Sequence, residues 1–395
     1  MKVGIPKESF SGERRVSLVP SAVAPLKKLG VDVLVETGAG DAAGYCDQDY
    51  SSAGAAIVPT AHALFQESDC IIAVRTCGAC GECWSTEVNR LRHGQILIGS
   101  CDPLSNPQAC AEAAKRGVTL FALELVPRIT RAQSMDVLSS MANIAGYRAV
   151  LLAATTLPKI FPMMTTAAGT ITPAKVLVLG VGVAGLQAIA TAKRLGAQVS
   201  AYDVRPAVKE QVQSLGAKFV ELALDTGSSE TSGGYAKAMG EEFYAKQREL
   251  LGRVVADSDV VVSTAVIPGR KAPLLVTRDA VSKMRPGSVI VDLAAERGGN
   301  CEATIPGQTT IVDGVTILGP TNLPSEVPFH TSQLLSRNNL TFFTHLLTLG
   351  LPEVSLDDEI FRETLVCRGG DVLHPKLREL LGLAPHNALA STQSV

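Results

Sequence analysis

The sequence has few aromatic residues and little charge: of its 395 residues, 4% are Phe, Trp or Tyr and 19% are Asp, Glu, Lys or Arg. The formal net charge is −2, and the basic residues form neither a stripe nor a patch interleaved with aromatic residues. A surface that binds nucleic acid needs such a concentration of positive charge, because phosphate contacts supply most of the attraction. The composition therefore excludes nucleic acid as a partner.

Long hydrophobic runs are missing as well. The nearest stretch, residues 137–155, is interrupted by Asn143 and Arg148. It falls short of the roughly 18 uncharged apolar residues of a membrane span. The first six residues read as a strand and show no charged, apolar and small-residue succession of a signal peptide. We expect a soluble chain without a leader.

The nine cysteines are an odd number in a long chain, which favours a reducing compartment, by default the cytoplasm, over a disulfide framework. Cys77, Cys80 and Cys83 have the spacing of thiolate ligands to zinc or an iron–sulfur cluster. The alternative is a glycine-rich surface turn with free thiols. A further ligand would have to come from a distant residue such as Cys101 or Cys110, and nothing else suggests electron transfer. We therefore expect no metal.

Small and aliphatic residues are abundant, and two series of β-branched runs alternate with helical patterns. This alternation predicts an α/β fold with parallel sheets covered on both faces. Since single cores stop growing at roughly 250 to 300 residues, we expect two domains. The C-terminal tail is too short for a core of its own and should rejoin the first domain. The predicted strands are residues 3–5, 32–35, 70–74, 96–98 and 119–123, then 175–179, 198–202, 218–220, 259–263, 288–292 and 315–318.

The most specific motif is Gly180-Val-Gly182-Val-Ala-Gly185, between the predicted strand 175–179 and a helical run that ends at Gly196. Here the first glycine allows a tight turn, the second lets a pyrophosphate approach the backbone, and the third lets the helix pack on the strand. The helix N-terminus adds free amide groups. The motif predicts a dinucleotide site.

Asp203 follows the next predicted strand, about twenty residues past the glycines, where a carboxylate can accept hydrogen bonds from the adenosine ribose. Its charge repels a 2′-phosphate and so favours NAD over NADP. Arg205 keeps NADP from being excluded outright; alternatively, it is a surface side chain that is solvated or stacks on adenine.

A polar segment, Arg128-Ile-Thr-Arg-Ala-Gln-Ser-Met-Asp136, separates an apolar run from the helical pattern 137–155. Gln133 can both donate and accept, as holding a nicotinamide carboxamide requires, and Asp136 can accept a forked pair of bonds from Arg128. The alternative is that Asp136 or Ser134 caps the following helix and the remainder is a solvated connector.

Residues 225–240 are rich in Gly and Ser and lack apolar periodicity, which predicts a mobile surface loop. Tyr235 lies within it, beside Gly234. The loop is either a lid that closes over bound nucleotide or an exposed turn with an incidental aromatic residue.

The segment Pro127–Tyr147 resembles the signature of the NAD-binding domain of the proton-translocating NAD(P) transhydrogenase family, which is related to alanine dehydrogenase. The resemblance covers most of the chain, and the Arg–Gln–Asp segment and the tyrosine loop are specific to the transhydrogenases. Further similar segments follow in order: Glu13-Arg-Arg-Val16, Gly180–Ile189, Asp203–Pro206, Gly234–Lys237, Thr264–Pro268 and Asp292–Asn300.

Pattern and resemblance together imply two Rossmann-like α/β domains with parallel sheets: residues 1–137 with 327–395, and an inserted dinucleotide-binding domain, residues 138–326. The resemblance implies that Arg128, Gln133, Asp136 and Ser139 set the nicotinamide for hydride transfer by positioning, without proton transfer. The residues expected to contact the cofactor are Gly180, Gly182, Val183, Gly185, Tyr202, Asp203, Val204, Arg205, Gly234, Tyr235 and Ala265.

The resemblance also implies partners. Only one glycine fingerprint of this kind is present, so NAD(H) binds here while NADP(H) and the proton channel belong to other polypeptides. We expect a membrane-spanning proton-channel subunit, an NADP-binding subunit, a homodimer of this chain, and a cytoplasmic location peripherally attached to the inner membrane.

Two other functions compete with this one. An alanine dehydrogenase-like enzyme needs a lysine and a histidine to hold and protonate a keto acid, but Arg75 and Gly99-Ser-Cys-Asp102 stand roughly where they are expected, although Arg15 is retained. A non-catalytic NAD-binding sensor or assembly module would need no residue such as Gln133 to fix the nicotinamide end.

Overall fold

The computed structural model describes residues 1–222, 241–267, 269–351 and 356–386. The chain divides into two compact units. Unit 1 comprises Met1–Met141 and Ser325–Val395, and unit 2 comprises Ala142–Pro324. The first boundary falls within helix α6 (Val137–Thr156). Each unit is described by itself below.

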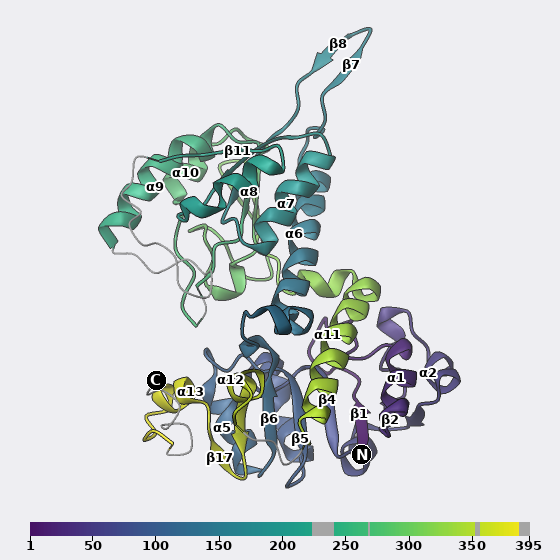
Figure 1. Cartoon of the computed structure of the whole chain (residues 1–395). Coiled ribbons are helices and arrows are strands. Elements are labelled where there is room, and N and C mark those ends of the chain that lie inside the picture. The colour runs from purple at the N-terminus through teal and green to yellow at the C-terminus, as the bar shows by residue number, and fades with distance from the viewer. Residues whose placement is uncertain (223–240, 268, 352–355, 387–395) are drawn as a thin grey trace. The chain divides into compact units, whose positions relative to one another are not determined.

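Unit 1 is built on a sheet with the strand order β17-β16-β6-β5-β4-β1-β2-β3 (Figure 1). Neighbouring strands from β6 to β3 pair in parallel, whereas β16 pairs antiparallel with both β6 and β17. The strands are β1 (Lys2–Ile5), β2 (Asp32–Glu36), β3 (Ala56–Val58), β4 (Cys70–Arg75), β5 (Ile96–Ser100), β6 (Thr119–Ala122), β16 (Leu365–Arg368) and β17 (Asp371–Val372). All strands predicted for this region are confirmed, and β3, β16 and β17 are additions.

Both faces of this sheet are buried, because successive side chains of a strand point to opposite faces. On β4, Ile72 and Val74 join one core, whereas Ile71 and Ala73 join the other. The first core is covered by α1 (Val23–Lys28), α2 (Asp47–Ala53), α11 (Pro328–Thr348) and α12 (Glu359–Thr364). The second is covered by α3 (Ala61–Glu67), α4 (Trp84–Glu87), α5 (Pro107–Lys115) and α13 (Pro375–Leu380).

Unit 2 repeats the arrangement with the strand order β11-β10-β9-β12-β13-β15-β14. All neighbours pair in parallel except the edge strand β14, which pairs antiparallel with β15. The strands are β9 (Lys175–Leu179), β10 (Gln198–Tyr202), β11 (Lys218–Phe219), β12 (Val260–Ser263), β13 (Val289–Asp292), β14 (Thr309–Val312) and β15 (Val315–Leu318). The predicted second series of strands is confirmed, with β14 as an addition.

The sheet of unit 2 is also covered on both sides. Val176 and Val178 of β9 face one core, and Leu177 and Leu179 face the other. The first core is covered by α6, α7 (Val183–Arg194) and α8 (Lys209–Ser214), and the second by α9 (Glu241–Ala256) and α10 (Arg278–Ser282). The expected fold class is therefore confirmed: both units are α/β, with sheets that are mainly parallel.

The strand order positions a site in each unit. In unit 2 the chain first builds outwards from β9 through β10 to β11, then returns to the other side of β9 with β12. In unit 1 the equivalent reversal lies between β1 and β4. Ligands of open parallel sheets bind at the carboxyl ends of the two strands at such a reversal.

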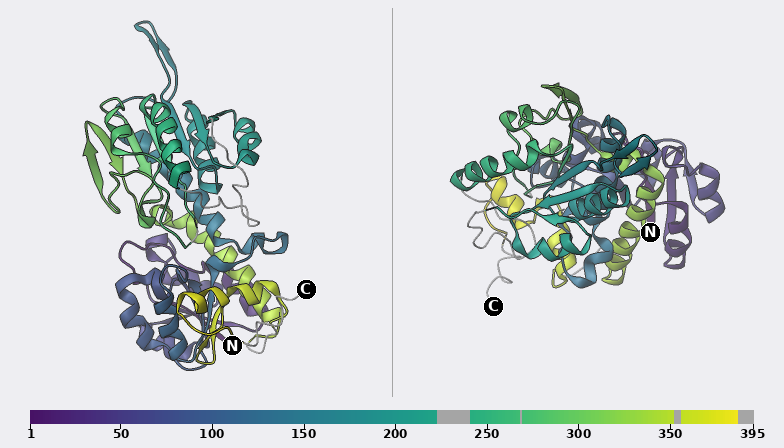
Figure 2. Two further views of the ribbon diagram at one scale, coloured as in Figure 1. Left: turned by 90° about the vertical axis from the view of Figure 1, so that its left-hand side faces the viewer. Right: turned by 90° about the horizontal axis from the view of Figure 1, so that it is seen from above.

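A hairpin of β7 (Met164–Thr166) and β8 (Gly169–Ile171) projects from the body of unit 2 (Figures 1 and 2). The sequence pattern did not predict it, because two strands of three residues show too little alternation. All six strand residues are exposed.

By length and composition, α6 is long and apolar enough to cross a membrane, and it is the one such helix among the residues that the structure describes. The expectation that no stretch reaches this length is therefore wrong for α6, since Asn143 and Arg148 do not interrupt the helix. Core helices pass the same test, and Ala149, Val150 and Ala153 of α6 lie in the core of unit 2.

Candidate nucleotide site

The glycine turn occupies the carboxyl end of β9, at the strand reversal of unit 2. Gly180 has a φ of +90°, which a side chain would strain. A Cβ on Gly185 would lie 2.0 Å from the carbonyl oxygen of Gly180, so only glycine lets the helix start this close to the strand. A Cβ on Gly182 would meet nothing within 4 Å among the described residues. The open space at Gly182 is what a ligand approaching the backbone requires.

Helix α7 begins directly after Gly182, and no side chain of the described ranges caps its N-terminus. The first amide groups of the helix have no intrahelical partner, and here they also have no such cap. An uncapped helix N-terminus beside an open glycine suits the phosphate groups of a dinucleotide. Val183 is the first residue of this helix and is half-buried.

Ala265 lies against the glycine turn from the neighbouring strand β12. A Cβ built on Gly180 would come 3.0 Å from the amide nitrogen of Ala265 and 2.9 Å from Oγ1 of Thr264. The Thr264 hydroxyl donates to the carbonyl oxygen of Gly180 at 2.9 Å. The two strand ends at the reversal are thus bound to each other, and Ala265 forms part of the same surface as the turn.

Asn300 holds the backbone of Ala265, which the sequence pattern did not predict. Its Oδ1 accepts the amide of Ala265 at 3.0 Å, and its Nδ2 donates to the carbonyl oxygens of Ala265 and Pro273 at 2.8 Å each. Asn300 is itself fixed by Asp292, whose buried carboxylate accepts its backbone amide at 2.8 Å. The only sequence signal was that both residues lie in a segment similar to the transhydrogenases.

Asp203 and Arg205 close the other side of the turn. Asp203 Oδ2 accepts the amide of Val181 at 2.7 Å, and Arg205 Nη2 donates to the carbonyl oxygen of Val181 at 3.2 Å. Arg205 is buried, so the alternative of a solvated surface arginine is wrong. Its guanidinium is an internal partner of the carboxylate that was expected to bind the ribose.

Tyr202 and Val204 flank Asp203, but their side chains pack into the protein. The hydroxyl of Tyr202 accepts a hydrogen bond from Nε2 of Gln247 at 2.8 Å, and burial raises the pKa of Tyr202. Val204 packs against the same core. Any contact of these two residues with a nucleotide must therefore come mainly from their backbone, unlike that of the Asp203 carboxylate.

The polar segment that contains Gln133 lies in unit 1. Its central residues form a short 3₁₀ helix, Thr130–Met135, with Ala132 and Met135 in the core and Arg131 and Gln133 exposed. Arg128 precedes it and is also exposed. The expectation of a connector between two core elements is confirmed, but the connector is anchored from below by apolar residues.

Asp136 caps helix α6. Its Oδ1 accepts the amide of Ser139 at 2.9 Å, and its Oδ2 accepts the Ser139 hydroxyl at 2.6 Å. This is the standard contact between an N-cap residue and the third residue of a helix. Ser139 is thereby fixed, and the forked pair predicted between Asp136 and Arg128 is not what holds Asp136 in place.

The predicted site residues thus form two groups, one in each unit. The turn Gly180–Gly185, Asp203, Arg205 and Ala265 are brought together in unit 2, and Arg128, Gln133, Asp136 and Ser139 in unit 1. Gly234 and Tyr235, with the predicted loop 225–240, lie outside the described residues.

The strand reversal of unit 1 is occupied by the side chains of the protein itself. The buried carboxylate of Glu13 accepts hydrogen bonds from Arg15, at 2.6 and 2.7 Å, and from Nε of Arg75 at 2.9 Å. Burial alone would raise the pKa of Glu13, but the two arginines outweigh it and lower the pKa to about 2. Glu13 thus takes the place that a substrate carboxylate would need between these guanidinium groups.

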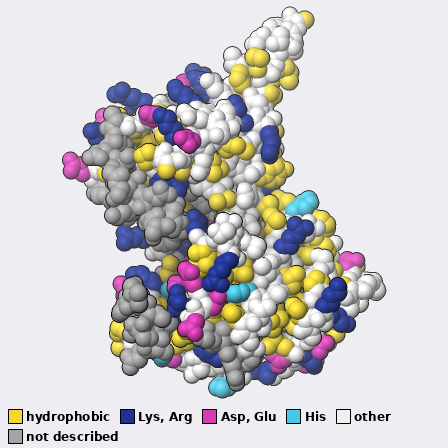
Figure 3. Space-filling view, viewed as in Figure 1, with side chains coloured by type: hydrophobic (Ala, Val, Ile, Leu, Met, Phe, Trp, Pro, Cys, Tyr) yellow, Lys and Arg dark blue, Asp and Glu magenta, His cyan; other side chains and the backbone are white. Residues whose placement is uncertain are grey.

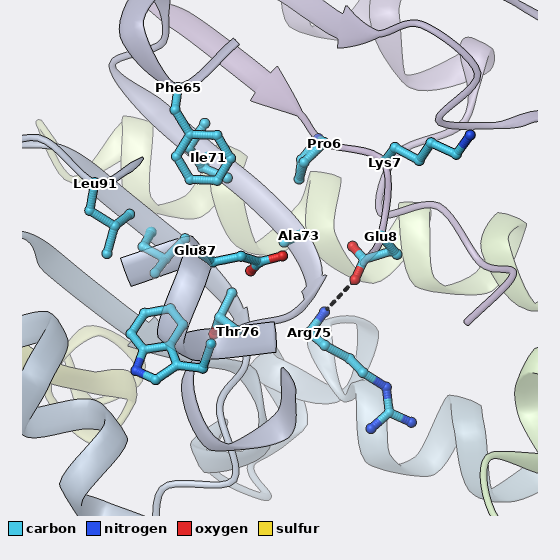
Figure 4. A pocket seen from close by; sticks show the side chains of 12 residues that line it. Pro6, Lys7, Glu8, Phe65, Ile71, Ala73, Arg75, Thr76, Glu87 and Leu91 are labelled. Atoms are coloured by element: carbon cyan, nitrogen blue, oxygen red, sulfur yellow. Dashed lines mark hydrogen bonds between the residues drawn. The ribbon is translucent and has the colours of Figure 1, made fainter. Parts of the chain in front are cut away.

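Glu8 and Glu87 line a small cavity beside this cluster (Figure 4). The cavity has a volume of about 10 Å³, room for about one water molecule. Glu8 accepts the amides of Val74 and Arg75 at 2.7 and 3.2 Å, and burial raises its pKa to about 8. In Figure 4 the guanidinium of Arg75 points away from both carboxyl groups. The cavity is too small for an amino acid or keto acid.

The spaced cysteines do not converge. The thiol of Cys80 donates to the carbonyl oxygen of Arg75 and that of Cys83 to Ser9, each at 3.2 Å. Cys77 lies beside Cys101 and Cys110, and burial raises its pKa. Cys77 and Cys80 are core residues, so the alternative of a surface turn is wrong for them. In the described ranges, no three His, Cys, Asp or Glu residues are grouped so that they could hold a metal ion.

The uncapped glycine turn at the reversal of a mainly parallel sheet defines a dinucleotide-binding α/β protein of the Rossmann type. The chain belongs to the alanine dehydrogenase/PNT family: residues 4–145 match the N-terminal domain of alanine dehydrogenase/PNT and residues 149–375 the C-terminal domain.

Its relatives include the first of the polypeptides that make up the NAD(P) transhydrogenase alpha subunit of Rhodospirillum rubrum, which is 47% identical over 382 residues, 95% of this chain and 99% of the relative. The solved structure of transhydrogenase from Sinorhizobium meliloti is similar with a TM-score of 0.82 and 44% identity, covering 95% of this chain and 99% of that one. L-alanine dehydrogenase is a more distant relative: its structure has a TM-score of 0.80 and 28% identity, covering 97% of this chain and 99% of that one.

Proposed function

We propose that this chain is the NAD(H)-binding subunit of a proton-translocating NAD(P) transhydrogenase. Hydride passes from NADH on this chain to NADP on a partner subunit, or in the reverse direction. The observation that carries the proposal is the open glycine turn of unit 2, bonded to the neighbouring strand end, in a chain 47% identical to a transhydrogenase alpha subunit. The cofactor supplies the hydride chemistry, and the protein supplies orientation.

Each group of residues has a separate task in this proposal. The turn Gly180–Gly185 and the start of α7 bind the pyrophosphate, Asp203 binds the adenosine ribose, and Ala265 contacts the cofactor from β12. Arg128, Gln133, Asp136 and Ser139 position the nicotinamide. Gly234 and Tyr235 belong to the lid. Hydride transfer between two nicotinamide rings needs no proton donor, so its rate depends on proximity and alignment.

The arginine cluster of unit 1 argues against an alanine dehydrogenase. A keto acid would have to displace Glu13 from both Arg15 and Arg75, and the displaced carboxylate would remain buried without its partners. Breaking a buried ion pair in this way costs about 3 to 5 kcal/mol. We therefore place no second substrate at the strand reversal of unit 1.

We propose a homodimer held by the β7–β8 hairpin. Residues 160–174 carry no charge, and Met163, Met164 and Ile171 are 66%, 45% and 49% exposed. Figure 3 shows the projecting hairpin without charged side chains. A groove at its base, about 780 Å³ in volume, is lined mainly by apolar residues such as Leu157, Ile160 and Phe161. A lone hairpin is barely stable in water, and a second copy offers it an apolar surface.

The other partners follow from the reaction. An NADP-binding subunit must present its nicotinamide to this chain, and a membrane-spanning subunit must carry the protons. The chain then works on the cytoplasmic side, attached to the inner membrane through these subunits.

A mixing assay tests the proposal. The purified chain is combined with the NADP-binding domain of a transhydrogenase, and reduction of an NADP analogue by NADH is followed by absorbance. We expect transfer that requires both proteins. Absence of transfer despite tight binding of the domain would contradict the proposal, and alanine-dependent reduction of NAD by the chain alone would favour an alanine dehydrogenase.

A further inference from the structure

Gln133 depends on its surroundings for a defined orientation. It is exposed on a 3₁₀ helix of six residues, Thr130–Met135. Such short 3₁₀ elements have weak hydrogen-bond geometry and little stability of their own. Ala132 and Met135 anchor the segment from below, but apolar contacts are not directional and leave its rotation open.

Two hydrogen bonds to residues more than 200 positions later flank Gln133. On one side, Nη1 of Arg131 donates to Oδ2 of Asp358 at 2.7 Å, 227 residues away. On the other side, Nδ2 of Asn338 donates to the carbonyl oxygen of Ser134 at 2.8 Å, 204 residues away. Both bonds lie within unit 1. They hold the segment on either side of Gln133.

Asp358 is itself well fixed. Its Oδ1 accepts the amide of Phe361 at 2.8 Å, which caps α12, and lies 3.1 Å from Nε2 of His345. Burial alone would raise the pKa of Asp358, but these bonds and Arg131 outweigh it and lower the pKa to about 2. The carboxylate is therefore charged at neutral pH and leaves Oδ2 for Arg131.

Asn338 is equally restrained. It is buried on α11, the helix that also carries His345, and the two are seven residues apart, so they share one face of the helix. Phe342, Phe343 and Leu346 root α11 in the core. The Oδ1 of Asn338 has no hydrogen-bond partner among the described residues, which costs stability. The bond from Nδ2 to Ser134 is what the side chain provides in return.

We propose that Asn338 and Asp358 are positioning residues for Gln133, acting through the two ends of the segment Arg131–Ser134. The proposal rests on the proposed function of Gln133 as the side chain that orients the nicotinamide. Neither residue touches the cofactor. They set the segment on two rigid elements, α11 and the start of α12, so that the carboxamide of Gln133 keeps the orientation that hydride transfer needs.

Three variants test this. Asp358→Ser keeps an N-cap for α12 but is too short to reach Arg131. Arg131→Met removes the same ion pair from its exposed end, where the fold is not at risk, since the Arg131 side chain is 50% exposed. Asn338→Ala removes the other bond. The control is Lys376→Met, which removes an exposed ion pair with Glu379 in α13, remote in sequence from the segment.

Two quantities are measured for each variant: the dissociation constant of NADH, and the single-turnover rate of hydride transfer to NADP on the partner domain. We expect the rate to fall about tenfold in all three variants, because a small misalignment of reacting groups costs that much, while the dissociation constant changes less than about twofold. The double variant Arg131→Met, Asp358→Ser should be no slower than the slower single one. The control should match the wild type.

Unchanged transfer in folded variants, with a wild type that transfers hydride, overturns the positioning role alone. A proportional loss of NADH binding and transfer overturns it as well, because a general loosening of the fold would then explain both. A wild type that transfers no hydride overturns the proposed function, and the positioning role with it.

Discussion

The carboxylate of Asp203 forms a two-oxygen ion pair with Arg205, in which Oδ1 lies 3.0 Å from Nε and Oδ2 lies 3.0 Å from Nη2. Both residues also bind the peptide groups of Val181, inside the glycine turn. The charge that favours NAD is thus partly neutralised from within the protein. A ribose must compete with Arg205 for the same carboxylate, and a guanidinium stands beside the place of a 2′-phosphate.

Replacing Asp203 by Asn should shift selectivity toward NADP(H) without adding a positive charge. The amide no longer holds Arg205 as an ion pair, so the guanidinium becomes a partner for a 2′-phosphate. We expect the ratio of the dissociation constants of NADPH and NADH to fall at least about tenfold, which corresponds to about 1.4 kcal/mol. Parallel titrations with the two nucleotides measure it. Adding Arg205→Leu should abolish the gain; if the gain persists, Arg205 is not its source.

Gly182 and Gly185 should respond differently to the same substitution. Gly182→Ala places its Cβ in open space at a φ of −80°, so the free energy of unfolding should change by less than about 0.5 kcal/mol while NADH binding weakens at least about tenfold. Gly185→Ala meets the Gly180 carbonyl at 2.0 Å and should cost about 2 kcal/mol or more of stability. Chemical denaturation and NADH titration separate the two effects. Equal losses of stability would contradict the assigned roles.

Glu8 predicts a pH dependence of stability. Burial raises its pKa from 4.5 to about 8, so the folded protein holds a proton that the unfolded chain releases above pH 4.5. Its stabilising effect is therefore complete below pH 4.5 and is lost as the pH rises toward 8, at up to about 1.4 kcal/mol per pH unit. Glu8→Gln should flatten the fall in unfolding free energy between about pH 5 and 8 by about that slope. Parallel slopes in the two proteins would show that Glu8 titrates normally.

The hairpin predicts the oligomeric state. Met163→Glu with Ile171→Glu places like charges on the exposed strand region and should separate the proposed dimer into monomers, because each charge must be desolvated at the contact. Analytical ultracentrifugation of both proteins measures the mass. The control is Ile311→Glu, at an exposed side chain of the edge strand β14, which should leave the mass unchanged. A dimeric double variant would exclude the hairpin as the contact.

Much of the fold could be predicted because the buried strands are continuous aliphatic runs. Residues 175–179 and 260–263 face a core on both sides, so nearly every position is apolar and the run is unmistakable. The strands β3, β14 and β16 were missed, since their patterns are short and those of β3 and β14 are partly exposed to water. The same holds for the hairpin, whose strands are exposed throughout.

The candidate site was predictable only where a residue type reports its own constraint. Glycines show a positive φ or a close approach, so Gly180 and Gly185 were assigned from spacing. Arg205 was assigned wrongly to the surface, because its partner is two residues away and the ion pair leaves no periodic signal. Asn300, Asn338 and Asp358 act across 35 to 227 residues, and such contacts exist only once the chain is folded.

The most direct test of the account follows a label. NADH deuterated at both C4 positions is mixed with NADP, the purified chain and an NADP-binding partner domain, and the products are analysed by mass spectrometry. Direct transfer between two nicotinamides predicts one deuterium on every NADPH formed, with none lost to water, and a rate that falls strongly in Gln133→Asn at unchanged NADH affinity. Deuterium released into the solvent, or transfer at the full rate in Gln133→Asn, would contradict it.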